Sequence, residues 1–449
     1  MKKKIIIFFI VTLVIVLGVL FVLYKFTDVF KQNKELFWKY ALTGADSTEM
    51  FNNENITSIN NQKVNNSYKQ KSEFQLKNEN DIYKLTIDTN AHDKNDSFSN
   101  IELAKNTDNI GKLKVVKKNN LLSFKLEEMT TFYITLKNSK LTELARKMDV
   151  EDADKIPDNL NAVDIQEVLN ISEDDVSYLS KKYSNIIVDK TNKNNYSKED
   201  KGKVKIDDKF YEVEKYKLSL SEKEHNEILK EVYFQLAQDS RALNLISQKL
   251  KLLNIPEQYS SINSLSSKFY ELSKEYANAN ASDNEYMQIT IYVENKKMIF
   301  TEIKVKDDAT IKVDYSKENN NLKVTCEGEN PIQIKNAPQW LNDFIRKIKE
   351  INISTNASTE HSEIITKVSC INNDDTEFNY STSIKITDDI ENNNDYENSS
   401  NIVLSDYNDT QLKAIYQLLS SKFKEYYDEK INIIQNNIEQ DNQAQSEED

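Results

Sequence analysis

Few residues in this 449-residue chain suit enzyme chemistry, since it contains only five glycines and three histidines. The glycines, at positions 18, 44, 111, 202 and 328, are too dispersed to build a phosphate-binding loop, and no serine lies in a G-x-S-x-G elbow. The histidines lack the spacing of metal ligands, and we expect them on the surface: His92, His225 and His361. We therefore expect no enzyme activity, no cofactor, no bound metal and no nucleotide.

Arginine is equally rare. Only Arg146, Arg241 and Arg346 occur among 59 basic residues, and the formal net charge is −14. Arginine supplies planar recognition of phosphate, and nucleic-acid binding normally requires a surplus of positive charge. We therefore expect no nucleic-acid partner.

Cysteine occurs twice. Cys326 follows Val324 by two residues, and Cys370 follows Val368 by two, so both thiols are predicted on the apolar side of strands. Outside the cytoplasm they could form a disulfide that closes a loop of about 45 residues and contributes roughly 4 kcal/mol. That bond requires Cα atoms within about 7 Å, which the sequence does not determine. The alternative is two buried free thiols, which pack as small hydrophobic side chains.

One long hydrophobic run, Ile5 to Tyr24, contains no charged residue. At about 1.5 Å of helical rise per residue it spans about 30 Å, the thickness of the hydrocarbon core of a bilayer. A cleaved signal peptide would need a shorter hydrophobic region and a small-x-small cleavage site, and neither is present. We predict an uncleaved signal anchor over residues 1–24, with the membrane as the partner of residues 5–24.

The orientation of this anchor depends on the lysines that flank it. Three precede the run in close succession and four follow it at wider spacing, and the denser group favours an N-terminus inside the cell: Lys2, Lys3 and Lys4, then Lys25, Lys31, Lys34 and Lys39. The body of the protein would then lie outside the cytoplasm, held at the cell membrane by a single pass.

A juxtamembrane helix is predicted over residues 25–45, where Phe26, Phe30, Phe37 and Tyr40 fall on roughly one helical face. These aromatic rings could lie at the level of the lipid headgroups. Alternatively, the helix packs on its own domain. We favour the second interpretation because Phe37 and Tyr40 lie two helical turns or more beyond the hydrophobic run.

The first folded lobe is predicted over residues 46–188. Apolar residues alternate with polar ones from 67 to 136, for example Tyr83, Leu85 and Ile87 with Lys84, Thr86 and Asp88. A period of two indicates about six antiparallel strands with one solvent-facing side. Helical periodicity returns after Asn138, so helices are expected to complete this lobe.

The second lobe is predicted over residues 203–438, after a polar stretch at 189–202 (DKTNKNNYSKEDKG) that is a linker or a long hairpin tip. A capping box, Ser221-x-x-Glu224, predicts the start of a helix, and alternating strands and a last amphipathic helix follow. An acidic tail at 439–449 is predicted to be disordered. Strand runs with helices on one side indicate an α+β fold: a transmembrane helix followed by two mainly antiparallel β-sheet lobes covered by helices.

Several short segments carry a resemblance to known proteins. These are LFWKY at 36–40, FYITLKNSKLTELARKM at 132–148, IPDNL at 156–160 and YKLSLSEKE at 216–224. With the anchor before them, they resemble an uncharacterised family of signal-anchored envelope proteins of AT-rich Gram-positive bacteria. That resemblance implies the topology and no activity. Two sheets curved over helices are also similar, at the level of the fold, to half-barrels of the lipoprotein-carrier kind.

The densest acidic patch comprises Asp388, Asp389, Glu391, Asp395 and Glu397. It could hold a calcium ion with weak affinity outside the cell, but it lacks the loop glycine and closing glutamate of an EF-hand. Paired aspartates are more typical of turns, so no metal site is predicted here.

Two classes of function remain. The alternating patterns are explained by core packing, which favours a structural or interaction protein of the cell envelope with an envelope protein as partner. The alternative is a binding module that holds a lipid or other hydrophobic ligand in the concavity of a half-barrel.

Overall fold

The computed structural model describes residues 33–41, 54–63, 66–77, 81–93, 95–139, 141–157, 159–160, 167–168, 171–206, 209–306, 309–314, 321–328, 346–374, 376–391 and 394–447. The predicted transmembrane helix at Ile5 to Tyr24 lies outside these residues. Within them, no helix combines the length and the apolar character needed to cross a bilayer.

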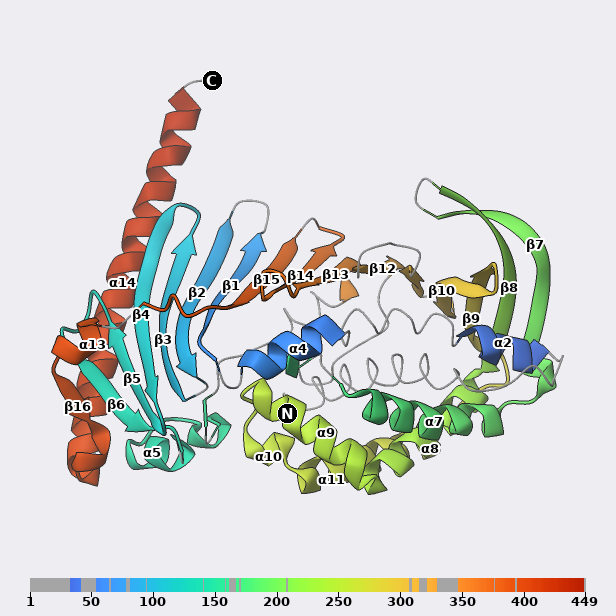
Figure 1. Ribbon diagram of the computed structural model, residues 1–449, viewed down its shortest axis with the longest axis horizontal. Coiled ribbons are helices and arrows are strands. Elements are labelled where there is room, and N and C mark those ends of the chain that lie inside the picture. The colour runs from blue at the N-terminus through green and yellow to red at the C-terminus, as the bar shows by residue number, and fades with distance from the viewer. Residues whose placement is uncertain are drawn as a thin grey trace. The chain divides into compact units, whose positions relative to one another are not determined.

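The fold is mixed α+β, as the sequence predicts, and it holds a large, mainly antiparallel sheet where the sequence predicts two sheets. The chain divides into two compact units (Figure 1). Unit 1 contains residues 1–57, 162–357 and 366–377, and unit 2 contains residues 58–161, 358–365 and 378–449. Each unit therefore combines segments that are distant in the sequence.

Unit 2 is built on a meander of six antiparallel strands, which confirms the prediction for residues 67–136. Strand β15, most of which belongs to this unit, lies beside β1, and the short strand β16 pairs in parallel with β6. The strand order is therefore β16-β6-β5-β4-β3-β2-β1-β15. The strands are β1 (Tyr68–Lys77), β2 (Ile82–Asp93), β3 (Asp96–Lys105), β4 (Asp108–Lys118), β5 (Leu121–Leu126), β6 (Tyr133–Lys137), β15 (Glu377–Ile386) and β16 (Asn401–Val403).

Asparagine makes the tight turns of this meander. Asn106, between β3 and β4, has φ 53°, and Asn119, between β4 and β5, has φ 54°. Two-residue hairpin turns need left-handed backbone, which asparagine tolerates better than most residues do. The abundance of asparagine in the sequence thus supports the hairpins of a chain that is poor in glycine.

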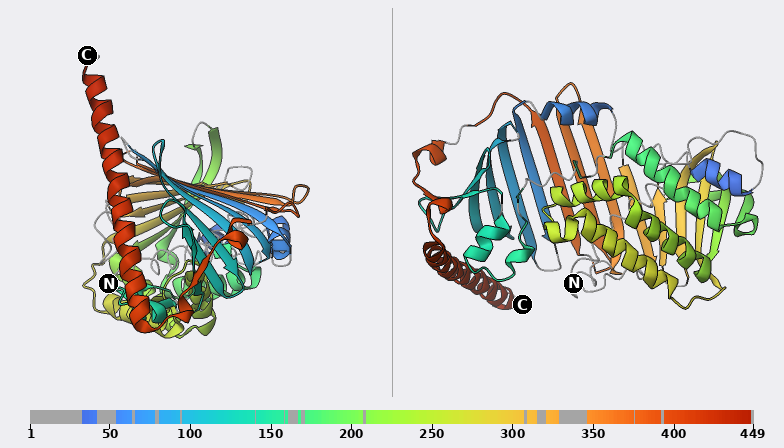
Figure 2. Two further views of the ribbon diagram at one scale, coloured as in Figure 1. Left: turned by 90° about the vertical axis from the view of Figure 1, so that its left-hand side faces the viewer. Right: turned by 90° about the horizontal axis from the view of Figure 1, so that it is seen from below.

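The helices of unit 2 follow the meander or close the chain. Figure 2 shows the last of them, α14, as one long helix that runs past the unit 2 strands. They are α5 (Leu141–Lys147), η3 (Ala153–Lys155), α13 (Asn394–Asn398), η5 (Leu404–Asp406) and α14 (Asp409–Glu447), and α4 (Glu54–Lys63) precedes β1.

Unit 1 holds the strands in the order β14-β13-β12-β11-β10-β9-β8-β7, and the pairs from β7 to β13 are antiparallel. Its strands are β7 (Tyr196–Ile206), β8 (Lys209–Ser221), β9 (Glu285–Glu294), β10 (Lys297–Val305), β11 (Ala309–Asp314), β12 (Asn321–Gly328) and most of β13 (Ile348–Ser358) and β14 (Glu363–Asn372). Its helices are α2 (Asn33–Ala41), α7 (Glu173–Lys190), η4 (Lys193–Asn195), α8 (Glu222–Gln238), α9 (Ser240–Leu252), α10 (Glu257–Ser260) and α11 (Ile262–Ala277).

The core of unit 1 is filled. Leu218 and Ile291 on the sheet are each 1% exposed, and Phe269 on α11 is fully buried. These side chains pack in one cluster with residues of α2, α7, α8 and α9. The predicted capping box is present. The Ser221 hydroxyl accepts a hydrogen bond from the Glu224 backbone N–H, and the Glu224 carboxylate accepts one from the Ser221 backbone N–H. Helices therefore bury most of this sheet face at β8 and β9.

The structure decides between lipid contact and domain packing for the described part of the predicted juxtamembrane helix. Phe37, Trp38, Tyr40 and Ala41 on α2 are buried in the core cluster of unit 1. Trp38 Nε1 also donates a hydrogen bond to Tyr196 Oη at 2.7 Å. Residues 33–41 thus pack on their own domain, which was the favoured interpretation.

The predicted polar linker at 189–202 is wrong. Helix α7 continues to Lys190, and strand β7 begins at Tyr196, which is 4% exposed. A side chain of Asn192 caps the intervening turn by accepting from the Asn194 backbone at 2.9 Å. The sequence of this segment resembles a linker because Tyr196 is its one large apolar residue and its other side chains are polar.

The predicted lobe boundaries and tail also need correction. Residues 378–438 belong to unit 2, since β15 lies beside β1 and Ser72 Oγ is 3.0 Å from Thr382 Oγ1. The tail predicted as disordered from residue 439 is helical as far as Glu447. Once a helix is formed, each further residue adds one backbone hydrogen bond, so even a polar sequence can extend it.

Candidate binding sites

One face of the unit 2 meander is apolar. The register aligns Phe74 with Leu85 and Leu85 with Leu103, so these three side chains form a row across β1, β2 and β3. Leu113 and Phe124 continue the same face on β4 and β5. We call this set the apolar face: Phe74, Leu76, Tyr83, Leu85, Ile87, Ile101, Leu103, Leu113, Val115, Phe124, Leu126, Ile134 and Leu136.

Of the side chains named here, Leu76 and Leu103 are each 40% exposed and the others are half-buried. Leu122, which lies on the same face opposite Leu136, is buried at 5% exposure. In unit 1 helices bury the corresponding residues of β8 and the second half of β9, while Met287 and Ile289 of β9 stay half-buried. The apolar face of unit 2 is therefore covered less well than a core requires, and a contiguous exposed apolar surface commonly marks a binding site.

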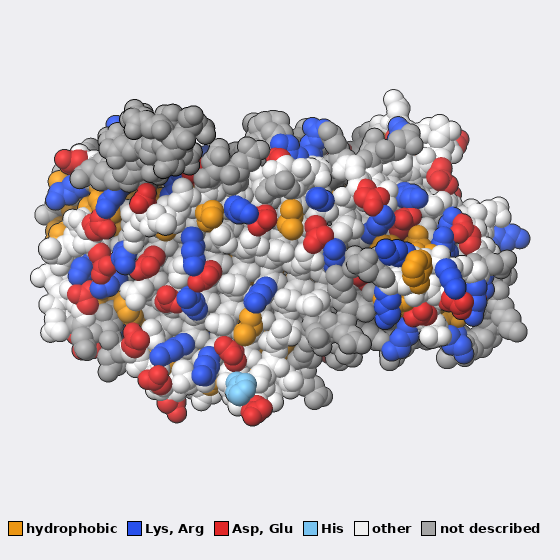
Figure 3. Space-filling view, turned by 90° about the horizontal axis from the view of Figure 1, so that it is seen from above, with side chains coloured by type: hydrophobic (Ala, Val, Ile, Leu, Met, Phe, Trp, Pro, Cys, Tyr) orange, Lys and Arg blue, Asp and Glu red, His pale blue; other side chains and the backbone are white. Residues whose placement is uncertain are grey.

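The opposite face of the same strands is charged. Lys84 pairs with Glu73 at 3.3 Å, and Lys112 pairs with Glu102 at 2.7 Å. Figure 3 shows a side of the molecule on which basic and acidic side chains intermix and hydrophobic ones are few. Exposed pairs of this kind contribute little stability, so they define the solvent-facing side and not a site.

Helix α14 reaches the apolar face at β4. Gly111, which aligns with Leu103, has Tyr426 Oη 3.5 Å from the place where a side chain would begin. The Tyr426 hydroxyl donates to the Ile110 carbonyl at 2.9 Å, and Lys413 pairs with Asp149 at 2.7 Å. Leu418 on this helix nevertheless stays 57% exposed. Polar contacts thus hold α14 to unit 2 with little apolar burial.

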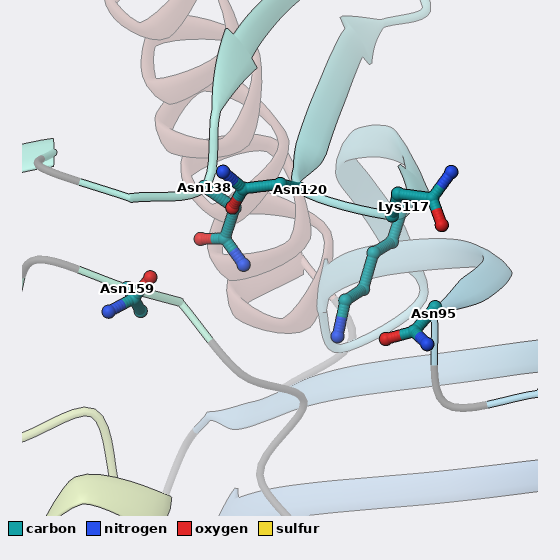
Figure 4. Close-up of a pocket in the computed structure, with 6 residues that line it drawn as sticks. Asn95, Lys117, Asn120, Asn138 and Asn159 are labelled. Carbon is teal, nitrogen blue, oxygen red and sulfur yellow. The ribbon is translucent and has the colours of Figure 1, made fainter.

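A polar cavity of about 500 Å³ lies at one end of the unit 2 sheet (Figure 4). One lysine and five asparagines line it: Asn95, Lys117, Asn119, Asn120, Asn138 and Asn159. Sequence reasoning missed this cavity. The available signal was that asparagines occupy alternate turns of a meander, which must meet at the same end of the sheet.

The acidic patch considered for calcium is used within unit 2. Asp395 accepts from Lys125 at 3.0 Å, from Lys114 at 3.1 Å and from the Tyr133 hydroxyl at 3.1 Å. Burial alone would raise the pKa of Asp395, but these hydrogen bonds and the two ammonium charges lower it to about 2. Asp395 therefore connects α13 to the charged side of β4–β6. Its carboxylate oxygens already bind these donors, which argues against Asp395 as a calcium ligand.

A buried carboxylate, Asp239, joins the helices of unit 1. Its side chain is 2% exposed and accepts from Lys182 at 3.0 Å and from the Tyr183 hydroxyl at 2.8 Å. It also caps α9 by accepting from the backbone of Arg241 and Ala242, each at 3.1 Å. With its acceptor positions filled in this way, Asp239 is a structural group.

The histidines are partly as predicted. His92 and His361 are exposed. His225 is half-buried on α8, with its ring centroid 4.9 Å from that of Tyr286. Burial lowers the pKa of His225, which favours its neutral form. The expectation of a surface position is thus wrong for His225, because that residue lies on the partly covered side of its helix.

Both cysteines are buried, and both are free thiols. Strand β13 lies between β12, which carries Cys326, and β14, which carries Cys370. Two strand spacings amount to about 10 Å, which exceeds the Cα separation that a disulfide allows. Of the two alternatives, the structure therefore supports two buried thiols, and burial raises the pKa of each to about 11.

We expect two alkylated cysteines per chain when the protein is unfolded without reductant in a maleimide reagent and weighed by mass spectrometry. Labelling of the folded protein should be slow, since both thiols are buried and protonated. A chain that takes up label only after reduction would contradict the strand order at β12–β14.

The comparisons with known proteins are sparse. No protein-family model matches the chain, and no curated protein matches its sequence. Among solved structures, a LolA-superfamily protein of Nitrosomonas europaea aligns at 8% identity over 74% of this chain and 92% of its own, with a TM-score of 0.16. A DUF1329 family protein of Desulfovibrio piger aligns at 10% identity over 77% and 94%, with a TM-score of 0.19.

These two neighbours include the lipoprotein-carrier type of protein to which the sequence suggests a fold-level likeness. TM-scores of 0.16 and 0.19 are too low to establish a shared fold. The resemblance to an envelope-protein family of Gram-positive bacteria stays a prediction.

Proposed function

We propose that this protein is a non-catalytic binding protein of the cell envelope, anchored in the cell membrane with its body outside the cytoplasm, and that unit 2 holds a lipid or other hydrophobic ligand. The observation that carries the proposal is the apolar face. Its side chains lie on six adjacent strands, and most of them keep some exposure. The uncharged run from Ile5 to Tyr24 supports the anchor.

An acyl chain suits this surface physically. Each methylene that leaves water for an apolar contact contributes about 0.8 kcal/mol, so roughly a dozen contribute about 10 kcal/mol before the costs of ordering the ligand. The face is broad, and the register places Lys105 at its margin, opposite Tyr83. The apolar rows inside that margin fit a flexible hydrocarbon better than a ligand that needs directed hydrogen bonds.

We expect a photo-crosslinker at position 103 of the full chain to capture lipid in intact cells of its host. Leu103→p-benzoylphenylalanine places the reactive ketone on the apolar face, where Leu103 is 40% exposed. Glu102→p-benzoylphenylalanine is the matched control, since the next residue of the same strand points to the charged side. Mass spectrometry of the crosslinked peptide should show a lipid adduct for position 103 only.

A second candidate is a structural or interaction protein, in which another envelope protein covers the apolar face. The core of unit 1 favours this interpretation for that unit, because helices of the same chain bury most of its sheet face at β8 and β9. The same crosslinking separates the two functions. A protein adduct at position 103 without lipid would support the second candidate and reject the first, and equal lipid adducts at positions 102 and 103 would reject specific binding.

A further inference from the structure

The apolar face of unit 2 is followed along its strands by polar side chains. Gln70 of β1 aligns with Thr89 of β2, and Thr89 aligns with Ser99 of β3. We call these three side chains the polar row. Gln70 lies on the same side of the sheet as Phe74, because residues separated by an even number share a face. At about 3.4 Å per residue, Gln70 lies about 14 Å from Phe74, within the length of one long acyl chain.

Burial increases from the apolar face to the polar row. Leu76 at the open end of β1 is 40% exposed, whereas Gln70 and Thr89 are each 7% exposed. Beyond the polar row, Tyr68 and Ala91 pack in a small buried cluster. The polar row therefore lies where the open part of the face meets packed core, and its polar groups are shielded from water.

Hydrogen bonds within the sheet leave part of the capacity of the polar row unused. Gln70 Nε2 donates to Ser72 Oγ at 3.3 Å, and Thr89 Oγ1 lies 2.8 Å from Ser99 Oγ. Among the residues that the structure describes, Gln70 Oε1 accepts no hydrogen bond. The hydroxyls of Thr89 and Ser99 share one bond, which uses one hydrogen and leaves the other to donate. The polar row thus offers one acceptor and one donor to a ligand.

A sheet face that only packs against helices does not need these groups. In unit 1, Leu218 of β8 aligns with Ile289 of β9, and both belong to the cluster that the helices cover. A buried amide or hydroxyl whose hydrogen bond is not made destabilises a fold. A ligand that completes the bonds of the polar row removes this cost.

We propose that unit 2 selects an uncharged amphiphile of the monoacylglycerol class, which joins an acyl chain through an ester to a group that carries hydroxyls. This proposal rests on the function proposed above, because the acyl chain lies on the apolar face. The ester carbonyl accepts from the Thr89 and Ser99 pair, and a glycerol hydroxyl donates to Gln70 Oε1.

The polar row itself carries no charge, which disfavours an ionic head group. Lys63 Nζ lies 4.9 Å from the centroid of the Tyr68 ring, one row beyond. Lys105, at the opposite margin of the face, pairs with Asp81 at 3.1 Å. A charged head group would lose water beside neutral partners, and burial of a charge costs far more than burial of a hydroxyl.

The test uses the full chain with p-benzoylphenylalanine at position 103, reconstituted in nanodiscs of dioleoylphosphatidylcholine. Three probes are added in equal amounts: 1-oleoylglycerol, its 3-phosphate, and 9-octadecene, which has the chain and no head group. Mass spectrometry of the crosslinked peptide counts each adduct. We expect a roughly tenfold or larger excess of the oleoylglycerol adduct over that of the phosphate. Equal adducts, or more of the phosphate, would overturn the proposal and leave lipid binding intact.

Two variants test the polar row. Gln70→Leu and Thr89→Val replace a hydrogen-bonding group by an apolar one of similar size, and circular dichroism checks that both fold. Each should lower the ratio of oleoylglycerol to octadecene adducts about fivefold, with capture of octadecene retained. Thr86→Val is the matched control, since Thr86 lies on the charged side and aligns with Glu73.

The outcomes separate this proposal from the one on which it rests. A ratio that both variants leave unchanged would place the head group elsewhere and reject the polar row, while the lipid-binding function stands. Absence of every lipid adduct at position 103 of the parent chain would reject the proposed function and, with it, this proposal.

Discussion

Replacement of Asp239 by alanine is expected to lower the free energy of unfolding of unit 1 by about 4 kcal/mol. Asp239 is a buried carboxylate that contacts three helices. It terminates α8, caps α9 and accepts from Lys182 and Tyr183 on α7. Its removal would leave the ammonium group and the hydroxyl of these α7 residues without their acceptor, and the first turn of α9 without its cap.

The expected size follows from the asymmetry of buried pairs. Removal of one partner leaves the other desolvated and unpaired, which costs about 3 to 5 kcal/mol for a fully buried ion pair. Lys182 retains 32% side-chain exposure, so part of its charge regains water and the lower end of that range applies. Loss of the cap adds about 1 kcal/mol.

The same group predicts an acid dependence. Burial alone would raise the pKa of Asp239, but hydrogen bonds from Ala242, Lys182 and Tyr183 lower it below its usual value. A carboxyl whose pKa is lower in the folded state stabilises the fold above its unfolded pKa of about 3.9, and this stability is lost as the pH falls towards the folded value. Asp239→Ala should therefore lose part of the acid sensitivity of unit 1.

Tryptophan fluorescence in a urea titration measures this change selectively, because the segments of unit 2 contain no tryptophan. Asp283→Ala is the surface control, since that side chain is 89% exposed. Asp239→Asn should lie between the two, because it keeps an acceptor for the cap and loses the charge. A loss below 1 kcal/mol for Asp239→Ala would contradict the structural role of the pair.

Local patterns in the sequence predicted local structure well. The alternation of Tyr83, Leu85 and Ile87 fixed one face of β2, and the pair Ser221 and Glu224 marked the start of α8. Both signals depend on residues within a few positions of one another. Period-two alternation and capping are properties of one strand or one helix end, so they need no tertiary information.

Non-local arrangement could not be predicted in the same way. Strand β15 lies beside β1, and β16 pairs with β6, each across more than half of the chain. Because of these pairings, the boundaries of the two units differ from those of the predicted lobes, and the C-terminal helix α14 belongs to unit 2. The strand order also separates Cys326 from Cys370 by one strand, which no spacing in the sequence reveals.

The candidate sites show a further limit. Leu85 on β2 and Leu218 on β8 have the same alternating surroundings in the sequence, yet the first is half-buried and the second is 1% exposed. Alternation identifies an apolar face, but it does not show whether helices of the same chain cover it. That difference depends on the number and position of the helices, which is a tertiary property.

Leu85→Glu is expected to reduce lipid capture at position 103 at least tenfold while unit 2 stays folded. Leu85 aligns with both Phe74 and Leu103, so its side chain lies within the apolar face. A carboxylate there would have to lose water when a hydrocarbon covers it, at a cost of several kcal/mol. Without the ligand the same carboxylate can remain hydrated, because the face is half-exposed.

The measurement introduces Leu85→Glu and, separately, Gln75→Glu into the chain that carries the photo-crosslinker at position 103. Gln75 lies on the charged side and aligns with Lys84, so the control adds the same charge without touching the apolar face. Circular dichroism reports the fold of both variants. If the face were ordinary core, Leu85→Glu would bury its charge at all times and unfold unit 2. A folded variant with undiminished lipid capture would show instead that the ligand lies elsewhere.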